Sequence, residues 1–275
     1  MEDGDQVRSY NLDKLDRSAE EDRLAVQARA ALAMELAYFM KLGLPTDATL
    51  VDIGCGPGLL SAELARLAPQ GRVIGVDADP KLLDLARARC AEQGLGHAEF
   101  VQAWADDTPL PSGGADLSYA RFLFQHLPKP IDAMKEMVRI VRPGGQVMIV
   151  DTDDGGLVVD PPVEGLDRLI AGSHAGQAAR GGDRHIGRKL RRYMHAAGLV
   201  DIKLEIVPFT SDMVGMQIFA DICLGFKSQV VPPEHMSPED VQATLARVHA
   251  LADDPGAWGQ TLAYVATGRV ASDGA

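Results

Sequence analysis

Short apolar segments alternate with segments of helical periodicity between residues 49 and 151. Apolar runs of this length are typical of strands buried on both faces, and the amphipathic stretches between them are typical of helices. The pattern therefore predicts an α/β fold with a parallel sheet flanked by helices. The predicted strands are 49–53, 72–76, 99–104, 115–120 and 146–151, and the predicted helices are 58–67, 80–93 and 131–141.

An amphipathic helix is predicted before the first strand. Ser18 and Glu21 have the spacing of a capping box, in which each side chain satisfies a backbone N–H of the first turn. Apolar residues then recur at helical spacing from Leu24 to Phe39. Gly43 and Pro45 predict the end of this helix.

After Asp151 the regular alternation of strands and helices is lost. Residues 152–185 are rich in Gly, Asp and Pro, with a short helix predicted near 163–172. A helix over 186–197 and strands over 202–207 and 262–267 follow.

Residues 211–260 separate the last two predicted strands, whereas a hairpin loop needs only about 2–5 residues. Helices are predicted over 213–225 and, after a Ser237 cap, over 238–252. We expect this insertion and 152–185 to cover the active site. Packing or a homodimer interface is the alternative.

These patterns predict an organisation in three parts. Residues 1–45 are expected to form an N-terminal arm and helix. Residues 46–210 and 261–275 are expected to form the core, to which 152–185 contributes part of the cap, and 211–260 the helical cap insertion.

Charge and composition narrow the function classes. The chain of 275 residues has a formal net charge of −12, which disfavours nucleic acid or an anionic membrane as the main partner. No apolar run approaches the roughly 18 residues of a membrane span, and the N-terminus MEDGDQVRSY has no apolar export segment. Cys55, Cys90 and Cys223 show no CxxC spacing, so neither a disulfide framework nor a metal site is predicted. We expect a reducing, cytoplasmic setting.

The most distinctive motif is VDIGCGPG at residues 51–58, at the end of the first predicted strand. Dense glycines permit close approach of a ligand to the backbone. Their spacing is G-x-G-x-G followed by Leu59, which is a poor match to the G-x-G-x-x-G or A pattern of dinucleotide sites. Asp77 ends the second strand in GVDADP, where a carboxylate can accept both hydroxyls of a ribose.

Three further stretches follow in order: FVQAWADDTPLP, ADLSYARFLFQHLPKP and MVRIVRPGGQVMIVD. Together with VDIGCGPG and GVDADP, they make the chain resemble class I S-adenosylmethionine-dependent methyltransferases over about residues 18–205. The resemblance is to the small-molecule group that includes the ubiquinone and menaquinone C-methyltransferases. It implies a Rossmann-like seven-stranded sheet, S-adenosyl-L-methionine as the cofactor and a small-molecule substrate.

The resemblance also implies roles for individual residues. The glycine motif would pass under the methionine part of the cofactor, Asp77 would hold the ribose, and Arg121 would lie near the methionine. Trp104 replaces an Asp that relatives often place against the adenine, and packing in the core is the alternative role for its ring. The implied cofactor-binding residues are Asp52, Gly54, Cys55, Gly56, Gly58, Asp77, Ala78, Trp104, Ala105, Asp106 and Arg121.

Methyl transfer needs a general base only if the acceptor must lose a proton, and a histidine with a pKa near neutrality can serve. His126 in FQHLP is the predicted base, with His174 and His185 as further candidates and a structural role as the alternative for each. Residues 181–199, GGDRHIGRKLRRYMHAAGL, also resemble a stretch of family members. This resemblance makes Asp183 or Arg184 a candidate substrate contact. A helix cap and a solvated basic face explain that stretch equally well.

Two further groups of residues are candidates for covering the site. The resemblance raises Tyr10 and Tyr38 as aromatic residues that close over the cofactor. Apolar residues over 213–226 predict an apolar wall, although core packing explains their spacing equally well.

The sequence therefore predicts an enzyme that transfers a methyl group to an O, N or C atom of a small metabolite. One alternative is a protein of this fold that binds the cofactor but acts as a cyclase or a non-catalytic partner. A nicotinamide-dependent oxidoreductase is a second alternative, which Leu59 disfavours.

Overall fold

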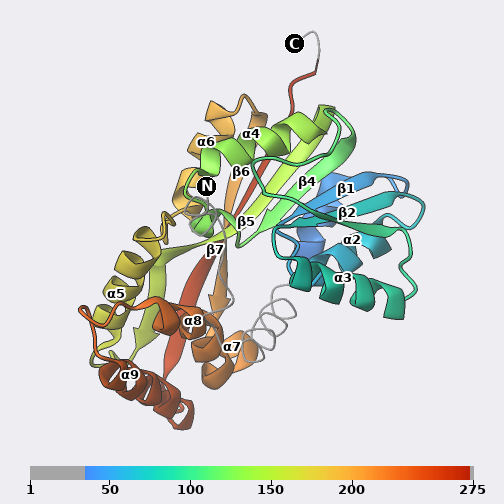
Figure 1. The fold of residues 1–275 in the computed structure, drawn as a ribbon. Coiled ribbons are helices and arrows are strands. Elements are labelled where there is room, and N and C mark those ends of the chain that lie inside the picture. Colours follow the sequence, from blue (N-terminus) through green and yellow to red (C-terminus); the bar gives the residue numbers. More distant parts are fainter. Residues whose placement is uncertain (1–34, 273–275) are drawn as a thin grey trace.

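A single mixed sheet lies at the centre of the protein. The computed structural model describes residues 35–272, and Figure 1 shows their arrangement. The strands are β1 (Thr49–Ile53), β2 (Arg72–Asp77), β3 (Ala98–Gln102), β4 (Ala115–Arg121), β5 (Val141–Asp160), β6 (Val200–Thr210) and β7 (Trp258–Arg269). They lie in the order β3-β2-β1-β4-β5-β7-β6, and β7 runs antiparallel to both of its neighbours. The prediction of a seven-stranded Rossmann-like α/β fold is confirmed.

Helices connect the strands, largely where the sequence predicts them. The α-helices are α2 (Leu59–Leu67), α3 (Pro80–Glu92), α4 (Pro130–Ile140), α5 (Leu166–Ala178), α6 (Leu190–Ala196), α7 (Ser211–Val214), α8 (Met216–Val230) and α9 (Pro238–Ala250). The 3-10 turns are η2 (Phe124–His126), η3 (Gly187–Lys189) and η4 (Leu251–Asp253). Residues 35–42 are also helical and end at Gly43, as predicted. The Ser18 capping box and Tyr10 lie outside the described residues.

Local capping explains where two of these helices begin. The Asp79 carboxylate accepts a hydrogen bond from the backbone N–H of Lys81, and Pro80 occupies the first turn of α3. Ser237 does the same for Asp240 at the start of α9. A side-chain oxygen at this position satisfies a backbone donor that the helix leaves unpaired.

The alternating side chains of each strand divide the core into two layers. Val51 and Ile53 of β1 face a buried cluster that includes side chains of α4 and α6. Leu50 faces the opposite cluster with α2 and the helix over 35–42. The polar side chain of Asp52 shares the second face, because residues two apart along a strand point the same way.

The strand β5 is longer than predicted. The sequence predicts that this strand ends at Asp151 and that a loop follows, but β5 continues to Asp160. The reason is its antiparallel partner: β5 pairs with β7 from Gln146↔Arg269 to Asp160↔Trp258, with an irregularity between Asp153 and Val158. Pairing across the sheet therefore overrides the weak strand propensity of the Gly- and Asp-rich sequence.

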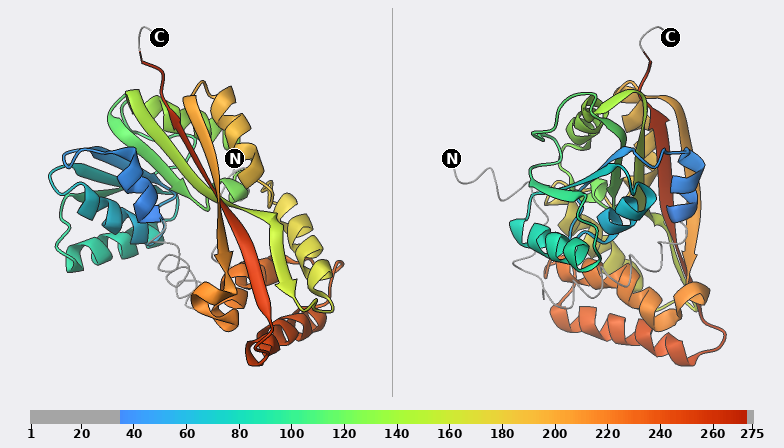
Figure 2. Two further views of the ribbon diagram at one scale, coloured as in Figure 1. Left: turned by 180° about the vertical axis from the view of Figure 1, so that it is seen from behind. Right: turned by 90° about the vertical axis from the view of Figure 1, so that its right-hand side faces the viewer.

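The extended ends of β5, β6 and β7 carry a second cluster of helices. Figures 1 and 2 show α5, α7, α8 and α9 gathered there, away from β1 and β2. Their apolar side chains, such as Leu169 and Phe219, form a separate buried cluster together with Phe209 of β6. We call residues 152–185 and 211–260 the cap. Its status as a separate domain stays a prediction.

α5 and α8 pack closely at Gly176, and a substitution there tests the packing of the cap. A Cβ at Gly176 would lie 1.8 Å from the carbonyl oxygen of Val230, so Gly176→Ala must force the helices apart. Overpacking of this kind typically costs about 1–3 kcal/mol. We expect a lower midpoint in urea or thermal unfolding. The control is Gly96→Ala, because a Cβ at Gly96 meets nothing within 4 Å; equal stability of the two variants would contradict this packing.

Candidate functional site

The glycine motif forms a left-handed turn at the carboxyl end of β1. Gly54, Gly56 and Gly58 have φ angles of 71°, 52° and 74°, which side chains other than glycine adopt at a cost. A Cβ at Gly58 would lie 2.6 Å from the Cβ of Ala86, so this glycine permits α2 to pack on α3. At Gly56 a Cβ meets no protein atom within 4 Å. Its bare backbone therefore borders open space where a ligand can approach.

Asp77 lies beside this turn at the end of β2. Its two carboxylate oxygens accept hydrogen bonds from the backbone N–H groups of Gly56 and Asp79, each at 2.9 Å. Burial raises the pKa of this carboxyl, and the two backbone donors oppose the shift. Each oxygen retains a lone pair for a further donor. Asp77 therefore fits the predicted role of holding two ribose hydroxyls.

Asp52 is a second buried carboxyl of the turn. Ser61 of α2 donates a hydrogen bond to it at 2.6 Å. Burial raises the pKa of Asp52 to about 7 against the opposing effect of Ser61, and the neighbouring carboxylates Asp77 and Glu35 raise it further while Arg121 lowers it. This group therefore changes charge close to neutral pH.

Arg121, at the end of β4, is held by the helix over 35–42. Its Nε lies 2.7 Å from the Glu35 carboxylate, which also accepts a hydrogen bond from Tyr119 at 3.2 Å. The guanidinium lies 4.8 Å from the ring centre of Phe122, a residue with the unusual φ of 49°. The turn after β4 is therefore fixed by a buried ion pair.

One cavity, of about 280 Å³, runs from these groups to the cap. At the sheet its walls include Gly56, Asp77 and Trp104. At the cap they include Ile222 and Phe226, with Phe209 of β6 beside them. The predicted site residues that border it are Asp52, Gly54, Cys55, Gly56, Asp77, Ala78, Trp104, Ala105, Arg121 and His126.

Not every predicted residue lies at this cavity. Gly58 packs against Ala86, and Asp106 is not among the lining residues. The hydroxyl of Tyr38 donates to Glu205 on β6, at an exposed position outside the cavity wall. Trp104 is half-buried and forms an isolated bridge with Asp107, beside the cavity rather than inside a helical core.

His126, in η2, is held at the cavity by Gln177 of α5. The Gln177 amide nitrogen donates to the backbone carbonyl of Gln125 at 2.9 Å and lies 3.0 Å from Nδ1 of His126. Because that carbonyl can only accept, the orientation of the Gln177 amide is set by the hydrogen-bond network. Nδ1 of His126 is then an acceptor, and the neutral ring carries its proton on Nε2.

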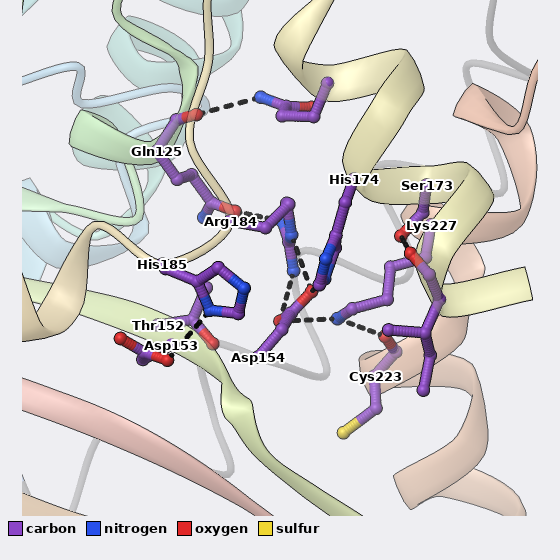
Figure 3. Close-up of polar contacts among 12 residues, drawn as sticks. Gln125, Thr152, Asp153, Asp154, Ser173, His174, Arg184, His185, Cys223 and Lys227 are labelled. Atoms are coloured by element: carbon purple, nitrogen blue, oxygen red, sulfur yellow. Dashed lines mark hydrogen bonds and ion pairs between the residues drawn. The ribbon is translucent and has the colours of Figure 1, made fainter. Parts of the chain in front are cut away.

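A buried charge network at the cap joins two residues that the sequence suggested, Arg184 and His174, to two that it did not, Asp154 and Lys227. Figure 3 shows Arg184, His174 and Lys227 converging on Asp154. Arg184 makes two hydrogen bonds of 2.9 Å to the Asp154 carboxylate. Lys227 Nζ lies 3.2 Å and His174 Nε2 3.1 Å from the same group. A single lysine within the apolar run of α8 was the available signal, since lysine is rarely buried without a partner.

The other polar candidates lie around this network. His185 contacts Asp153, which also forms an ion pair with Arg188. Asp183 accepts from the backbone N–H of His185 and pairs with Lys189. The expectation that it caps the following helix is wrong, because η3 and α6 both begin without a side-chain cap. Of the stretch over 181–199, only Arg184 borders the cavity.

Comparison with known proteins decides the family of the core. Residues 51–149 match the family described as a methyltransferase domain. They form a class I methyltransferase domain. The resemblance proposed from the sequence is confirmed, together with S-adenosyl-L-methionine as the cofactor of this domain.

Curated relatives match only part of their length. The chain is 38% identical over 113 residues to trans-aconitate 2-methyltransferase of Azoarcus sp. (strain BH72), covering 40% of this chain and 41% of that protein. It is 32% identical over 113 residues to the ubiquinone/menaquinone C-methyltransferase UbiE of Hahella chejuensis (strain KCTC 2396), covering 40% and 45%. The chain thus spans less than half the length of these two relatives.

The fold extends beyond the matched domain. The crystal structure of the cyclase SpnF superposes with a TM-score of 0.60 at 22% identity, covering 90% of this chain and 83% of that one. This likeness concerns the fold alone. Within residues 35–272, no helix has the length and apolar composition of a membrane span.

The methyltransferase domain fits its cofactor at both ends. Open space at Gly56 accommodates a ligand against the backbone, and Asp77 has acceptor capacity for a ribose. The carboxyl of Asp52, which also borders the cavity, can supply a negative charge to a cationic ligand. Which residues bind the cofactor stays a prediction.

The raised pKa of Asp52 predicts a pH-dependent affinity. Below about pH 7 its carboxyl is neutral, and above it the carboxylate attracts the cationic S-adenosylmethionine. We therefore expect the affinity for S-adenosylmethionine to rise with pH between about 6 and 8. At the lower pH, binding of the cofactor should release a proton from Asp52. Calorimetry in buffers of different ionisation enthalpy measures both the affinity and the number of protons released. In Asp52→Asn the dependence should flatten; an unchanged pH profile would contradict the assignment.

Proposed function

We propose that the protein is an S-adenosylmethionine-dependent methyltransferase that acts on an O, N or C atom of a small metabolite. The observation that carries the proposal is that one and the same cavity borders the glycine turn, Asp77 and the apolar side chains of the cap. An acceptor bound between Ile222 and Phe226 on one side and the cofactor on the other would be shielded from water. The cytoplasmic setting, the absence of nucleic-acid partners and a homodimer stay predictions.

The bound cofactor supplies an electrophilic methyl group. The task left to the chain is to align the acceptor and exclude water, and such positioning can contribute on the order of 7–11 kcal/mol. The cap side chains suit this task, because they line the same cavity as the residues at the carboxyl ends of β1 and β2. The names of the curated relatives concern different small molecules and leave the acceptor of this chain open.

His126 is the residue proposed to contact the reacting part of the acceptor. It borders the cavity, and its ring packs edge-on against Phe226 with centroids 5.2 Å apart. With Nδ1 accepting from Gln177, its neutral ring can donate from Nε2 to an acceptor oxygen. To act as a general base through Nε2, the ring must carry its proton on Nδ1. Nδ1 would then donate to the Gln177 side-chain oxygen instead of accepting from its nitrogen.

Cofactor binding tests the proposed function directly. Asp77→Asn keeps the size of the side chain but removes its charge and one acceptor oxygen. Since hydrogen bonds to charged groups contribute about 1.5–3 kcal/mol, we expect S-adenosylhomocysteine to bind roughly 10- to 150-fold more weakly in calorimetry. The control is the exposed Asp47→Asn. No binding to the wild-type protein would overturn the proposal; binding without methyl transfer to any acceptor would favour the cyclase or non-catalytic alternative.

The state of His126 can be measured before any acceptor is known. Nitrogen NMR of the histidine side chains distinguishes protonated from bare ring nitrogens. Because the Gln177 amide donates to it, we expect Nδ1 of His126 to be bare at a pH where the ring is neutral. In Gln177→Leu this preference should weaken. A proton on Nδ1 in the wild-type protein would refute the donor role and support the general base.

A further inference from the structure

The charge network of the cap contains more positive than negative charge. Arg184 and Lys227 are 7% and 5% exposed, and both point to the same carboxylate, Asp154. Burial would raise the pKa of Asp154, but the Lys227 charge and the contacts of His174 and Arg184 lower it well below its ordinary value. One permanent negative charge therefore faces two cations. Burying an uncompensated charge costs free energy unless a partner of opposite sign binds there.

No other carboxylate fully restores the balance. Asp151 also senses Arg184, but burial raises its pKa to about 7 in spite of the hydrogen bonds from Thr152 and Gln125, so it is only partly ionised at neutral pH. Asp153 is engaged by Arg188 and His185. Burial, followed by the charge of Arg184, lowers the pKa of Lys227 to about 8 although Asp154 opposes this shift. Lys227 is thus held where its charge is poorly compensated.

Both cations retain unused donors at the cavity. Three of the five N–H groups of an arginine are engaged in Arg184: two by Asp154 and one by the Gln125 side chain. Lys227 gives one of its three to the Cys223 carbonyl at 2.7 Å and one to Asp154. Among residues 35–272 no further acceptor contacts these two groups. Arg184 and Lys227 both border the cavity, so the remaining donors can be reached by a ligand.

The surroundings of these donors are apolar. Phe209, Ile222, Phe226 and Leu262 border the same cavity as Arg184 and Lys227. A ligand that fits both features has an apolar body and one anionic group. The excess of about one positive charge matches a monoanion better than a dianion such as a phosphate.

We propose that Arg184 and Lys227 bind a carboxylate of the methyl acceptor and that the acceptor is an apolar monocarboxylic acid. This inference rests on the proposed function. Asp154 holds the two cations in place, and the apolar cap residues contact the rest of the acceptor. The carboxylate is a recognition group at the cap end of the cavity, and the methylated atom lies toward the domain end. The alternative is a purely structural network that joins the cap to η2 through Gln125.

Benzoate, benzamide and phenyl phosphate are matched probes for this subsite. We expect wild-type protein, titrated by calorimetry or NMR, to bind benzoate at least tenfold more tightly than the neutral benzamide and more tightly than phenyl phosphate. Benzoate affinity should fall as the pH rises through about 8, where Lys227 loses its charge beside Arg184, Asp154 and Cys223. No preference for benzoate over benzamide overturns the proposal, and tighter binding of phenyl phosphate overturns the choice of a carboxylate.

Variants at Lys227 separate recognition from structure. Lys227→Met leaves Asp154 paired with Arg184 and removes the excess charge, so we expect the unliganded protein to be at least as thermally stable and the preference for benzoate to be lost. Lys227→Arg should retain the preference, and the exposed Lys135→Met should change neither property. A preference that survives in Lys227→Met, or a marked loss of its stability, overturns the proposal in favour of a structural network.

The probes are titrated with and without S-adenosylhomocysteine, whose own binding is measured on the same samples. A benzoate preference without any S-adenosylhomocysteine binding would refute the methyltransferase proposal and leave the anion subsite standing. Binding of S-adenosylhomocysteine without a benzoate preference would refute the anion subsite and leave the methyltransferase proposal standing. The two proposals can therefore fail separately.

Discussion

The antiparallel pairing of β5 with β7 joins the methyltransferase domain to the cap. Along one part of its length this ladder completes the sheet of the methyltransferase domain, and along the other it supports the cap. β5 pairs with β4 and β7 in the domain, then leaves β4 and continues with β7 alone. Because one pair of strands runs through both parts, the cap and the carboxyl ends of β1 and β2 line one cavity. The shape of this cavity therefore depends on the β5–β7 ladder.

The two ends of the cavity differ in the sign of the charged side chains that line them. The turn after β1 gathers carboxylates, Asp52 and Asp77, that suit a cationic and hydroxyl-bearing ligand. The cap gathers cations around a single carboxylate, Asp154, and suits an anion. This separation of charge would orient two ligands with respect to each other before any chemistry occurs, since each is repelled from the site of the other.

How much was predictable depends on the range of the interactions. The core strands and helices were predicted well, because their apolar periodicity and caps such as Asp79 and Ser237 are local. The extension of β5 was not, because it depends on pairing with residues about a hundred positions away in the sequence. The glycine turn, Asp77 and His126 were found at the cavity through their motifs. Asp154 and Lys227 belong to no motif, and only the fold brings them together.

Trp104 has a practical consequence that follows from its place in the cavity wall. The chain contains two tryptophans, and the other, Trp258, begins β7 at the far end of the cap. A ligand stacking near Trp104 would change the environment of one indole while the second is left as a constant background. The protein therefore carries its own fluorescent reporter in the cavity wall. Occupancy of the cavity can be followed by tryptophan emission with no added label.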